Sequence, residues 1–266
     1  MRILDLFSRG QIAYLPRNLP KELNSLEFRI VKICREYRLD NGLGPVEGIH
    51  KVVMHPDSVW SDSHRCSVYF IDGNGCLGHW RYGDENWTYL DDPRDSGGYD
   101  DIAVYGGRVC VVDKFGSVWQ IDSSFWLGCF PSPISGGNHG RCWKYLVVSS
   151  GDLYLVDKCI RHGANESRPI RAVNTRAHDF RVYRLDRPRA RWEEVRSLGN
   201  SAFFLCDRCS FAVPACKLGR RDGNCIYYTE EAVSSNSSSK DVRVFSLADR
   251  TSKFLNFSDF PPGMTR

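Results

Sequence analysis

The sequence predicts an all-β fold, a β-propeller of four-stranded blades, on three observations. Two apolar strands joined by a Gly- or Asp-containing turn recur along the chain, most clearly at 67–80, 103–122 and 146–157. Matching turns are about one blade apart, since Asp113 follows Asp72 by 41 residues. A hairpin cannot bury its apolar face alone, so neighbouring copies must stack into a common core.

The first third of the chain is less regular. Residues 3–16 are expected to form a strand, a Gly-containing turn and a second strand. The apolar spacing of 23–39 fits a helix as well as an interrupted strand, and the surrounding β pattern disfavours the helix. Residues 1–66 are therefore assigned to N-terminal strands and this ambiguous segment.

The clearest blades are expected within 67–260. A hairpin around the DGNG turn is followed by a short strand at 87–90 and by a Pro-, Gly- and Asp-rich connection at 91–101. Further copies of the pattern begin at Phe180 and Val242.

The blade number is left open by the later part of the chain. Two additional strand candidates, 202–206 and 225–229, interrupt the repeat. The polar segments 161–179 and 234–240 show no apolar period and are expected to be loops, where disorder should concentrate.

The length and charge of the chain limit the classes of protein to which it can belong. The 266 residues are 42% hydrophobic, and residues 1–266 are predicted to form a single domain. A formal net charge of +4 is small, so no nucleic-acid partner is expected. No apolar run approaches the roughly 18 residues of a membrane span, which predicts no membrane partner.

The eleven cysteines predict reduced thiols and a cytoplasmic or nuclear location, because their number is odd and the first residues do not resemble a signal peptide. The best candidate for a metal site has the spacing C-x2-C-x6-C-x8-C, and four thiolates could bind zinc tetrahedrally. Buried reduced cysteine more often behaves as a small hydrophobe, so no metal ligand is predicted. The four candidate residues are Cys206, Cys209, Cys216 and Cys225.

No catalytic or cofactor-binding residue is predicted. The histidines are scattered, and neither HExxH, GxSxG nor a phosphate-binding glycine loop is present. Four aspartates recur after strands and could line a channel or bind calcium, but capping of turns by their carboxylates is favoured: Asp72, Asp113, Asp157 and Asp186. Most tryptophans are expected in the core, with one or two exposed on a binding rim; they are Trp60, Trp80, Trp87, Trp119, Trp126, Trp143 and Trp192.

An ordered set of segments resembles the plant KIB-type β-propeller family, also called domain of unknown function 295. The matching stretches follow the family order: LDLFSRGQIAYLPRNLPKELNSLEFRI, NWTYLDD, YDDIAVYGGRVCVVDKFGSVWQID, KYLVVSSGDLYLVD, FRVYRLDRPRARWEEVRSLGNSAFFL, GNCIYYTEE and VRVFSL. Each stretch alone is weakly specific, whereas the ordered set is specific.

The resemblance implies a role in target recognition. Members of the family usually carry an F-box upstream of the propeller, which docks onto a Skp-type adaptor of an SCF ubiquitin ligase. The segment 15–38 opens like an F-box but has too few residues for its three helices, so no F-box is predicted in 1–266. Relative to the family, both ends are expected to be trimmed, which would put ring closure in doubt.

Three functions follow as hypotheses. The first is a non-catalytic protein-interaction propeller that binds a protein target, with a Skp-type adaptor as partner only where an F-box exists upstream. The alternative is an F-box-less or degenerate family member, cytoplasmic, nuclear or organellar, with no ubiquitin-ligase role. The third, an enzyme, rests only on the analogy with hydrolases that share the propeller fold.

Overall fold

In a computed structural model, the described residues form strands in the order β1 to β21, with one short 3-10 helix among them. Among the described residues, no helix has the length and apolar character needed to cross a membrane. The described residues are 2–4, 11–14, 22–24, 29–31, 48–56, 66–81, 83–90, 97–121, 128–134, 142–160, 178–218, 223–231 and 240–255.

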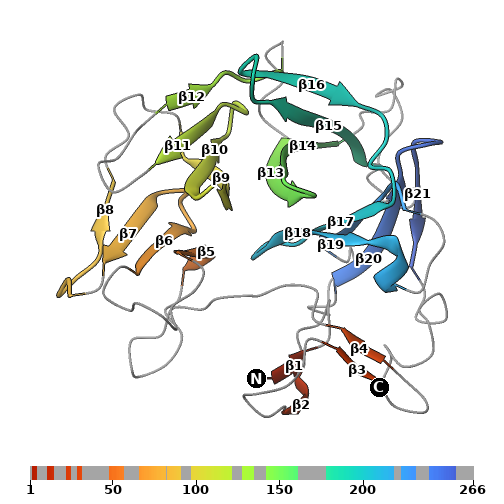
Figure 1. Ribbon diagram of the computed structural model, residues 1–266, viewed down its shortest axis with the longest axis horizontal. Coiled ribbons are helices and arrows are strands. Elements are labelled where there is room, and N and C mark those ends of the chain that lie inside the picture. The colour runs from red at the N-terminus through yellow and green to blue at the C-terminus, as the bar shows by residue number, and fades with distance from the viewer. Residues whose placement is uncertain are drawn as a thin grey trace, which may run out of the picture.

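Three sheets have four antiparallel strands each, in chain order, as the repeat predicts (Figure 1). We call them the first, second and third blades. The first contains β5 (Ile49–His55), β6 (Ser67–Asp72), β7 (Leu77–Arg81) and β8 (Thr88–Tyr89). The second contains β9 (Tyr99–Tyr105), β10 (Arg108–Asp113), β11 (Val118–Ile121) and β12 (Gly128–Phe130). The third contains β13 (Cys142–Ser149), β14 (Asp152–Ile160), β15 (His178–Asp186) and β16 (Arg191–Val195).

The fourth blade departs from the simple repeat. It has five strands in the order β18-β17-β19-β20-β21, and β17 pairs with β19 in parallel. Both additional strand candidates are confirmed, as β17 and β19, whereas β18 and the parallel pairing were not predicted. The elements are β17 (Ser201–Leu205), β18 (Ser210–Pro214), η3 (Ala215–Leu218), β19 (Cys225–Glu231), β20 (Lys240–Ser246) and β21 (Thr251–Phe254).

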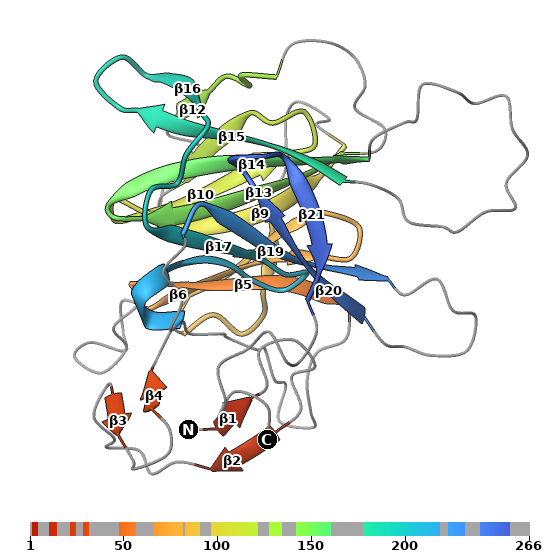
Figure 2. The same cartoon turned by 90° about the vertical axis from the view of Figure 1, so that its right-hand side faces the viewer.

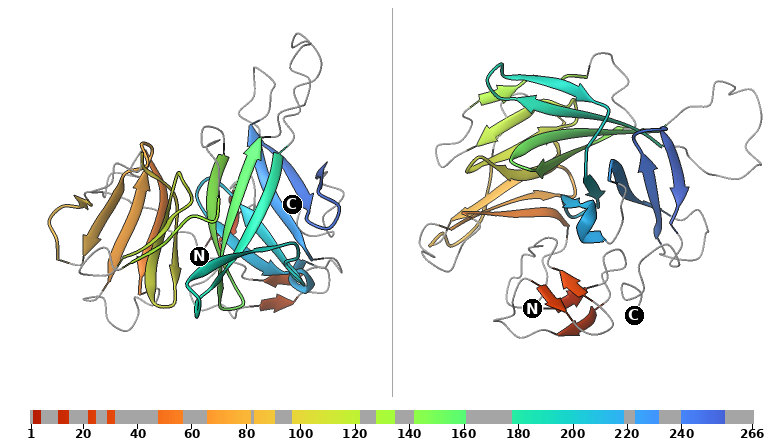
Figure 3. Two further views of the ribbon diagram at one scale, coloured as in Figure 1. Left: turned by 90° about the horizontal axis from the view of Figure 1, so that it is seen from above. Right: turned by 45° about the vertical axis from the view of Figure 1, so that its right-hand side comes forward.

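The N-terminal strands form two small antiparallel pairs. β1 (Arg2–Leu4) pairs with β2 (Gln11–Tyr14), as the strand-turn-strand pattern predicts. β3 (Glu22–Asn24) pairs with β4 (Arg29–Val31), so the ambiguous segment is β where it is described. These strands lie together to one side of the four blades (Figures 2 and 3).

Two hairpin turns repeat the same hydrogen bonds. The Asp72 carboxylate accepts from the backbone N–H of Asn74 at 2.9 Å and of Cys76 at 2.8 Å. The Asp113 carboxylate accepts from Phe115 and Ser117, each at 2.9 Å. The predicted turn-capping role is confirmed for both aspartates.

Three boundaries differ from the sequence prediction. The connection expected at 91–101 ends earlier, because Tyr99, Asp100 and Asp101 already belong to β9. β15 starts at His178 and β20 at Lys240, within the ends of the two predicted loops. The remainder of those loops, with their expected disorder, lies outside the described residues.

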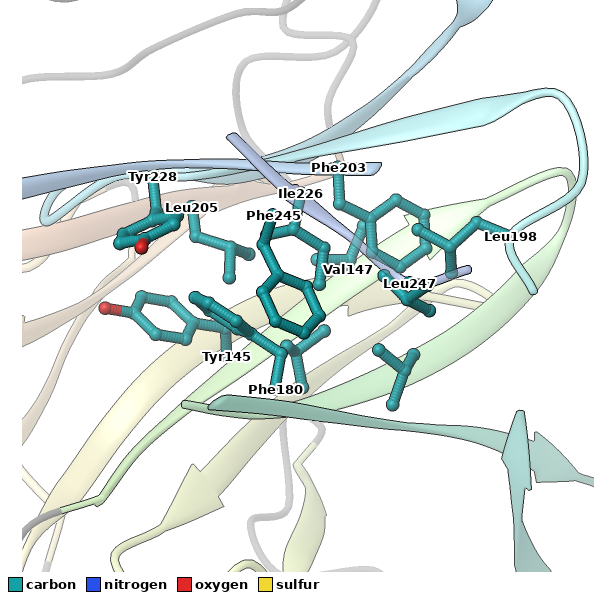
Figure 4. Close-up of a cluster of buried hydrophobic side chains, with 12 residues drawn as sticks. Tyr145, Val147, Phe180, Leu198, Phe203, Leu205, Ile226, Tyr228, Phe245 and Leu247 are labelled. Carbon is teal, nitrogen blue, oxygen red and sulfur yellow. The ribbon is translucent and has the colours of Figure 1, made fainter. Parts of the chain in front are cut away.

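Buried apolar clusters lie between the first and second, the second and third, and the third and fourth blades, as a stacked repeat requires. Between the third and fourth blades, Phe180 contacts both Tyr228 and Phe245, with 4.9 Å between ring centroids in each case (Figure 4). A separate cluster on the fourth blade stacks Phe204 on Tyr227, with η3 contributing Leu218.

The first strands of the first three blades and β18 of the fourth blade lie closest to the centre of the ring (Figure 1). β5 contacts β9, β9 contacts β13, and β13 contacts β18, the innermost strand of the fourth blade. We call the end of the ring at which these four strands begin the top face. The Asp72 and Asp113 turns lie at the same end, because Asp72 pairs with Ile49 and Asp113 with Tyr99.

Candidate functional site

A buried ion pair lies at the centre of the ring, near the top face. Lys51 Nζ on β5 lies 2.7 Å from Asp101 Oδ1 on β9, and the two side chains are 5% and 1% exposed. Lys51 also donates a hydrogen bond to Ser210 Oγ on β18, at 3.2 Å. We call Lys51, Asp101 and Ser210 the polar hub.

The Asp101 carboxylate joins all four blades. Besides Lys51 of the first blade, it accepts from its neighbour Ile102 N at 2.7 Å, from Leu146 N of the third blade at 2.9 Å and from Ser210 Oγ of the fourth blade at 2.9 Å. Burial of a charge is costly unless ion pairing and hydrogen bonds compensate. These contacts supply that compensation, so the polar hub fixes the blades relative to one another.

A second buried ion pair lies inside the third blade. Lys144 Nζ is 2.7 Å from Asp157 Oδ1, with side-chain exposures of 1% and 3%, and the two residues are direct cross-strand partners. The backbone N–H of Lys144 donates to Asp100 Oδ2 at 3.0 Å. Burial raises the pKa of Asp100, while this hydrogen bond and the Lys144 charge act in the opposite direction.

Tyr145 lies beside the polar hub and is unsuited to acid-base chemistry. The Lys51 ammonium is 5.1 Å from the centre of its ring. Burial, followed by the charges of Asp207 and Asp101, raises the pKa of the Tyr145 hydroxyl far above its ordinary value. The hydroxyl therefore stays protonated at physiological pH.

Each blade carries an exposed aromatic residue in a turn at the top face or near the end of a strand on that side. Tyr89 lies beside the Asp72 turn, Phe115 is in the Asp113 turn, and Trp143 is the second residue of β13. Phe254 is the last residue of β21 and lies opposite Arg243, the central residue of β20. Their exposures are 50%, 45%, 45% and 49% in that order.

The Trp143 ring is held by a cluster of polar and aromatic groups. Lys158 Nζ lies 5.6 Å from the Trp143 ring centre and 4.9 Å from that of Tyr228, and it donates to the Thr229 carbonyl at 3.4 Å. His178 contacts both aromatic rings. Such fixed aromatic side chains suit a binding surface, because little conformational entropy is lost when a partner covers them.

The four-cysteine zinc candidate is not assembled. Cys206 and Cys225 are buried, whereas Cys216 is exposed. Within the described ranges, a single group of three or more potential metal ligands comes together, and it contains none of these four cysteines. That group is Cys142, Asp157 and Cys159.

The expectation that all thiols are reduced is wrong for one pair. A disulfide joins Cys142 to Cys159, seventeen residues later in the chain. The two are direct cross-strand partners at the top-face end of β13 and β14. Register, which sequence spacing alone does not give, brings them together.

The other predicted residues have mixed outcomes. Asp186 caps its turn weakly, at 3.4 Å from Arg189 N, whereas Asp157 lies inside a strand and its predicted turn role is wrong. Of the described tryptophans, Trp87 and Trp143 are exposed and three are partly buried, with Trp119 Nε1 donating to Asp113 at 3.1 Å; Trp60 and Trp126 lie outside the described residues.

Sequence reasoning missed the two buried lysines that form ion pairs with aspartates. Lys51 and Lys144 each interrupt an apolar strand, and a lysine inside such a strand is the signal that could have found them. Asp100 and Asp101 were assigned to a loop, which hid their pairing with these strands.

The sequence profile of the KIB1-4 beta-propeller family matches residues 1–246. The chain belongs to this family. The KIB1-4 profile covers the N-terminal strand pairs, the first three blades and nearly all of the fourth blade up to the end of β20, so the predicted resemblance is confirmed.

Curated relatives of this KIB1-4 propeller include several F-box proteins of Arabidopsis thaliana. The putative F-box protein At5g60060 is 36% identical over 240 residues, which are 86% of this chain and 61% of that protein. F-box protein SKIP23 is 28% identical over 232 residues, covering 80% and 55% of the two chains. The chain thus spans about 60% of the length of these relatives.

Proposed function

We propose that the chain is a non-catalytic protein-interaction propeller that recognises a protein target on its top face, as the target-recognition part of an SCF ubiquitin ligase. The observation that carries the proposal is that each of the four blades has an exposed aromatic residue in a turn or near a strand end on that side of the ring. Aromatic residues are enriched at the centres of protein interfaces, where they supply much of the binding energy. The family and its F-box relatives support a recognition role.

The polar hub supports this function by fixing the geometry of the face. Because Asp101 contacts all four blades, the aromatic side chains are carried on a rigid frame. A preorganised surface loses less entropy on binding than a mobile one.

Proximity labelling in plant cells with the tagged chain would identify target candidates, and direct binding to each would then be measured. The double variant Phe115→Ala/Trp143→Ala is expected to bind its target at least about 30-fold more weakly, the effect of losing one strong hot spot. Val148→Ser changes an exposed apolar residue at the opposite end of β13 and should leave binding unchanged. Equal affinity of the double variant and the wild type would overturn the assignment to the top face.

The ubiquitin-ligase role is tested separately by co-purification with a Skp-type adaptor. If no adaptor co-purifies, the alternative is favoured, an F-box-less family member without ligase activity, and the proposed interaction function is unaffected.

We also propose a cytoplasmic or nuclear location. A fluorescent tag at the C-terminus tests it, and a signal from an organelle would be the contrary result.

A further inference from the structure

Four sulfur-bearing or charged side chains share one face of the third blade, close to the top of the ring. β13 and β14 are paired so that Cys142 lies opposite Cys159 and Lys144 opposite Asp157. Alternate residues of a strand point to the same side, and direct cross-strand partners do so as well. The two sulfur atoms therefore lie next to the buried ion pair.

The Asp157 carboxylate divides its two oxygen atoms between these neighbours. Oδ1 lies 2.7 Å from Lys144 Nζ, and Oδ2 lies 3.3 Å from Cys159 Sγ. A thiol can donate a hydrogen bond to that oxygen, whereas a disulfide sulfur carries no proton to donate. The position of Oδ2 thus suits a reduced Cys159, or a cation bound between the oxygen and the sulfur.

We propose that Cys142, Cys159 and Asp157 form a redox-gated site for a thiophilic divalent cation of the Zn²⁺ class. Their ligand atoms all lie within 4.8 Å of one another. Ligands of tetrahedral zinc are about 3.3–3.8 Å apart, so small side-chain movements complete the site, with water as the fourth ligand. Lys144 on the other carboxylate oxygen acts as the outer partner that orients a metal-binding carboxylate.

The charges of the group favour a divalent ion. Two thiolates and Asp157 contribute three negative charges, Lys144 contributes one positive charge, and a divalent cation brings the sum to zero. In the absence of metal, the two cysteines can be neutral thiols and Asp157 remains paired with Lys144. Each state of the site is therefore electrically balanced.

Disulfide formation and metal binding exclude each other. Two small thiols reduce the Cys142–Cys159 bond: the sulfur–sulfur bond breaks, each cysteine takes up one proton and one electron, and the reductant leaves as its own disulfide. The cation then replaces both thiol protons, which are released to solvent. Oxidation withdraws both sulfur ligands together, so the site binds metal only in the reduced state.

Cobalt titration of the whole purified chain tests the site. After reduction with a phosphine and its removal under nitrogen, Co²⁺ is expected to bind once per chain with a thiolate-to-cobalt charge-transfer band, and Zn²⁺ should displace it. Two protons should be released per ion bound. The oxidised chain should show no band.

Variants separate this site from the other cysteines. Cys142→Ser and Cys159→Ser should each abolish the band, whereas the matched Cys206→Ser/Cys209→Ser variant should retain it. Asp157→Asn should weaken cobalt binding at least about tenfold. Near-ultraviolet circular dichroism of each reduced variant confirms folding, so that a lost band reports a lost ligand.

Three results would overturn the proposal. They are the absence of a charge-transfer band in the reduced wild type, a band of equal strength in the oxidised chain, and a band that survives Cys142→Ser. The site is independent of target recognition, because binding of a partner to the top face enters none of these measurements.

Discussion

The two buried Lys–Asp pairs have the same 2.7 Å separation, yet their surroundings give them different roles. Lys51–Asp101 links different blades, and both Asp101 oxygens accept further hydrogen bonds from the protein. Lys144–Asp157 lies across one strand ladder, and the second Asp157 oxygen faces a sulfur atom. A carboxylate surrounded by protein donors fixes structure, whereas one with an oxygen beside a reactive group is available for chemistry.

Removal of Asp101 should destabilise the protein more than removal of Asp157. Asp101→Ala should lower the free energy of unfolding by about 5 kcal/mol, the upper end for loss of one partner of a buried pair, because Leu146 N–H, Ile102 N–H and Ser210 also lose their acceptor. Asp157→Ala should cost about 3 kcal/mol. Urea unfolding of the oxidised proteins measures both values. An equal or larger cost for Asp157→Ala would remove the distinction between the pairs.

Replacement of each whole ion pair by apolar residues should affect stability differently at the two sites. The free energy of unfolding of Lys144→Met/Asp157→Leu should lie within about 1 kcal/mol of the wild-type value, because an apolar pair of similar volume can replace a buried ion pair. Lys51→Met/Asp101→Leu should remain at least about 2 kcal/mol less stable, because buried backbone donors are left without acceptors. The same urea titrations measure both double variants. If both have the wild-type free energy of unfolding, the additional hydrogen bonds of Asp101 contribute nothing to stability.

Loss of the hydrogen bonds that link the polar hub to the fourth blade should reduce stability only slightly. Ser210→Ala should cost about 1 kcal/mol, since it removes hydrogen bonds to Lys51 and Asp101. The control is Ser201→Ala, which removes a hydroxyl that accepts a long 3.4 Å hydrogen bond from Ser149 and should cost less, about 0.5 kcal/mol. Thermal unfolding measures the stability of both variants. A larger loss of stability in Ser201→Ala than in Ser210→Ala would contradict the proposed role of the polar hub.

The repeated turns show which parts of the fold can be predicted from sequence. Asp72 and Asp113 cap their turns through backbone donors two and four residues further along the chain. All participants lie within one short segment, so the local sequence carries the whole interaction. The antiparallel hairpins of the first three blades are predictable for the same reason.

The fourth blade and the candidate site show where sequence reasoning fails. The parallel pairing of β17 with β19 joins strands that are separated by a further strand and a 3-10 helix. Asp157 looks like the turn aspartates in sequence, but it lies opposite Lys144 inside a strand ladder. Nothing in the local pattern around either feature specifies its partner.

The all-β class, the period of the blades and the capped turns can be predicted from the sequence, because apolar alternation and turn chemistry act over a few neighbouring residues. The contacts of Lys51 with Asp101 and Ser210 at the centre of the ring, and the pairing of Cys142 with Cys159, are visible only in the folded chain. These contacts depend on register and on how the blades stack, which are set by burial of the whole apolar surface.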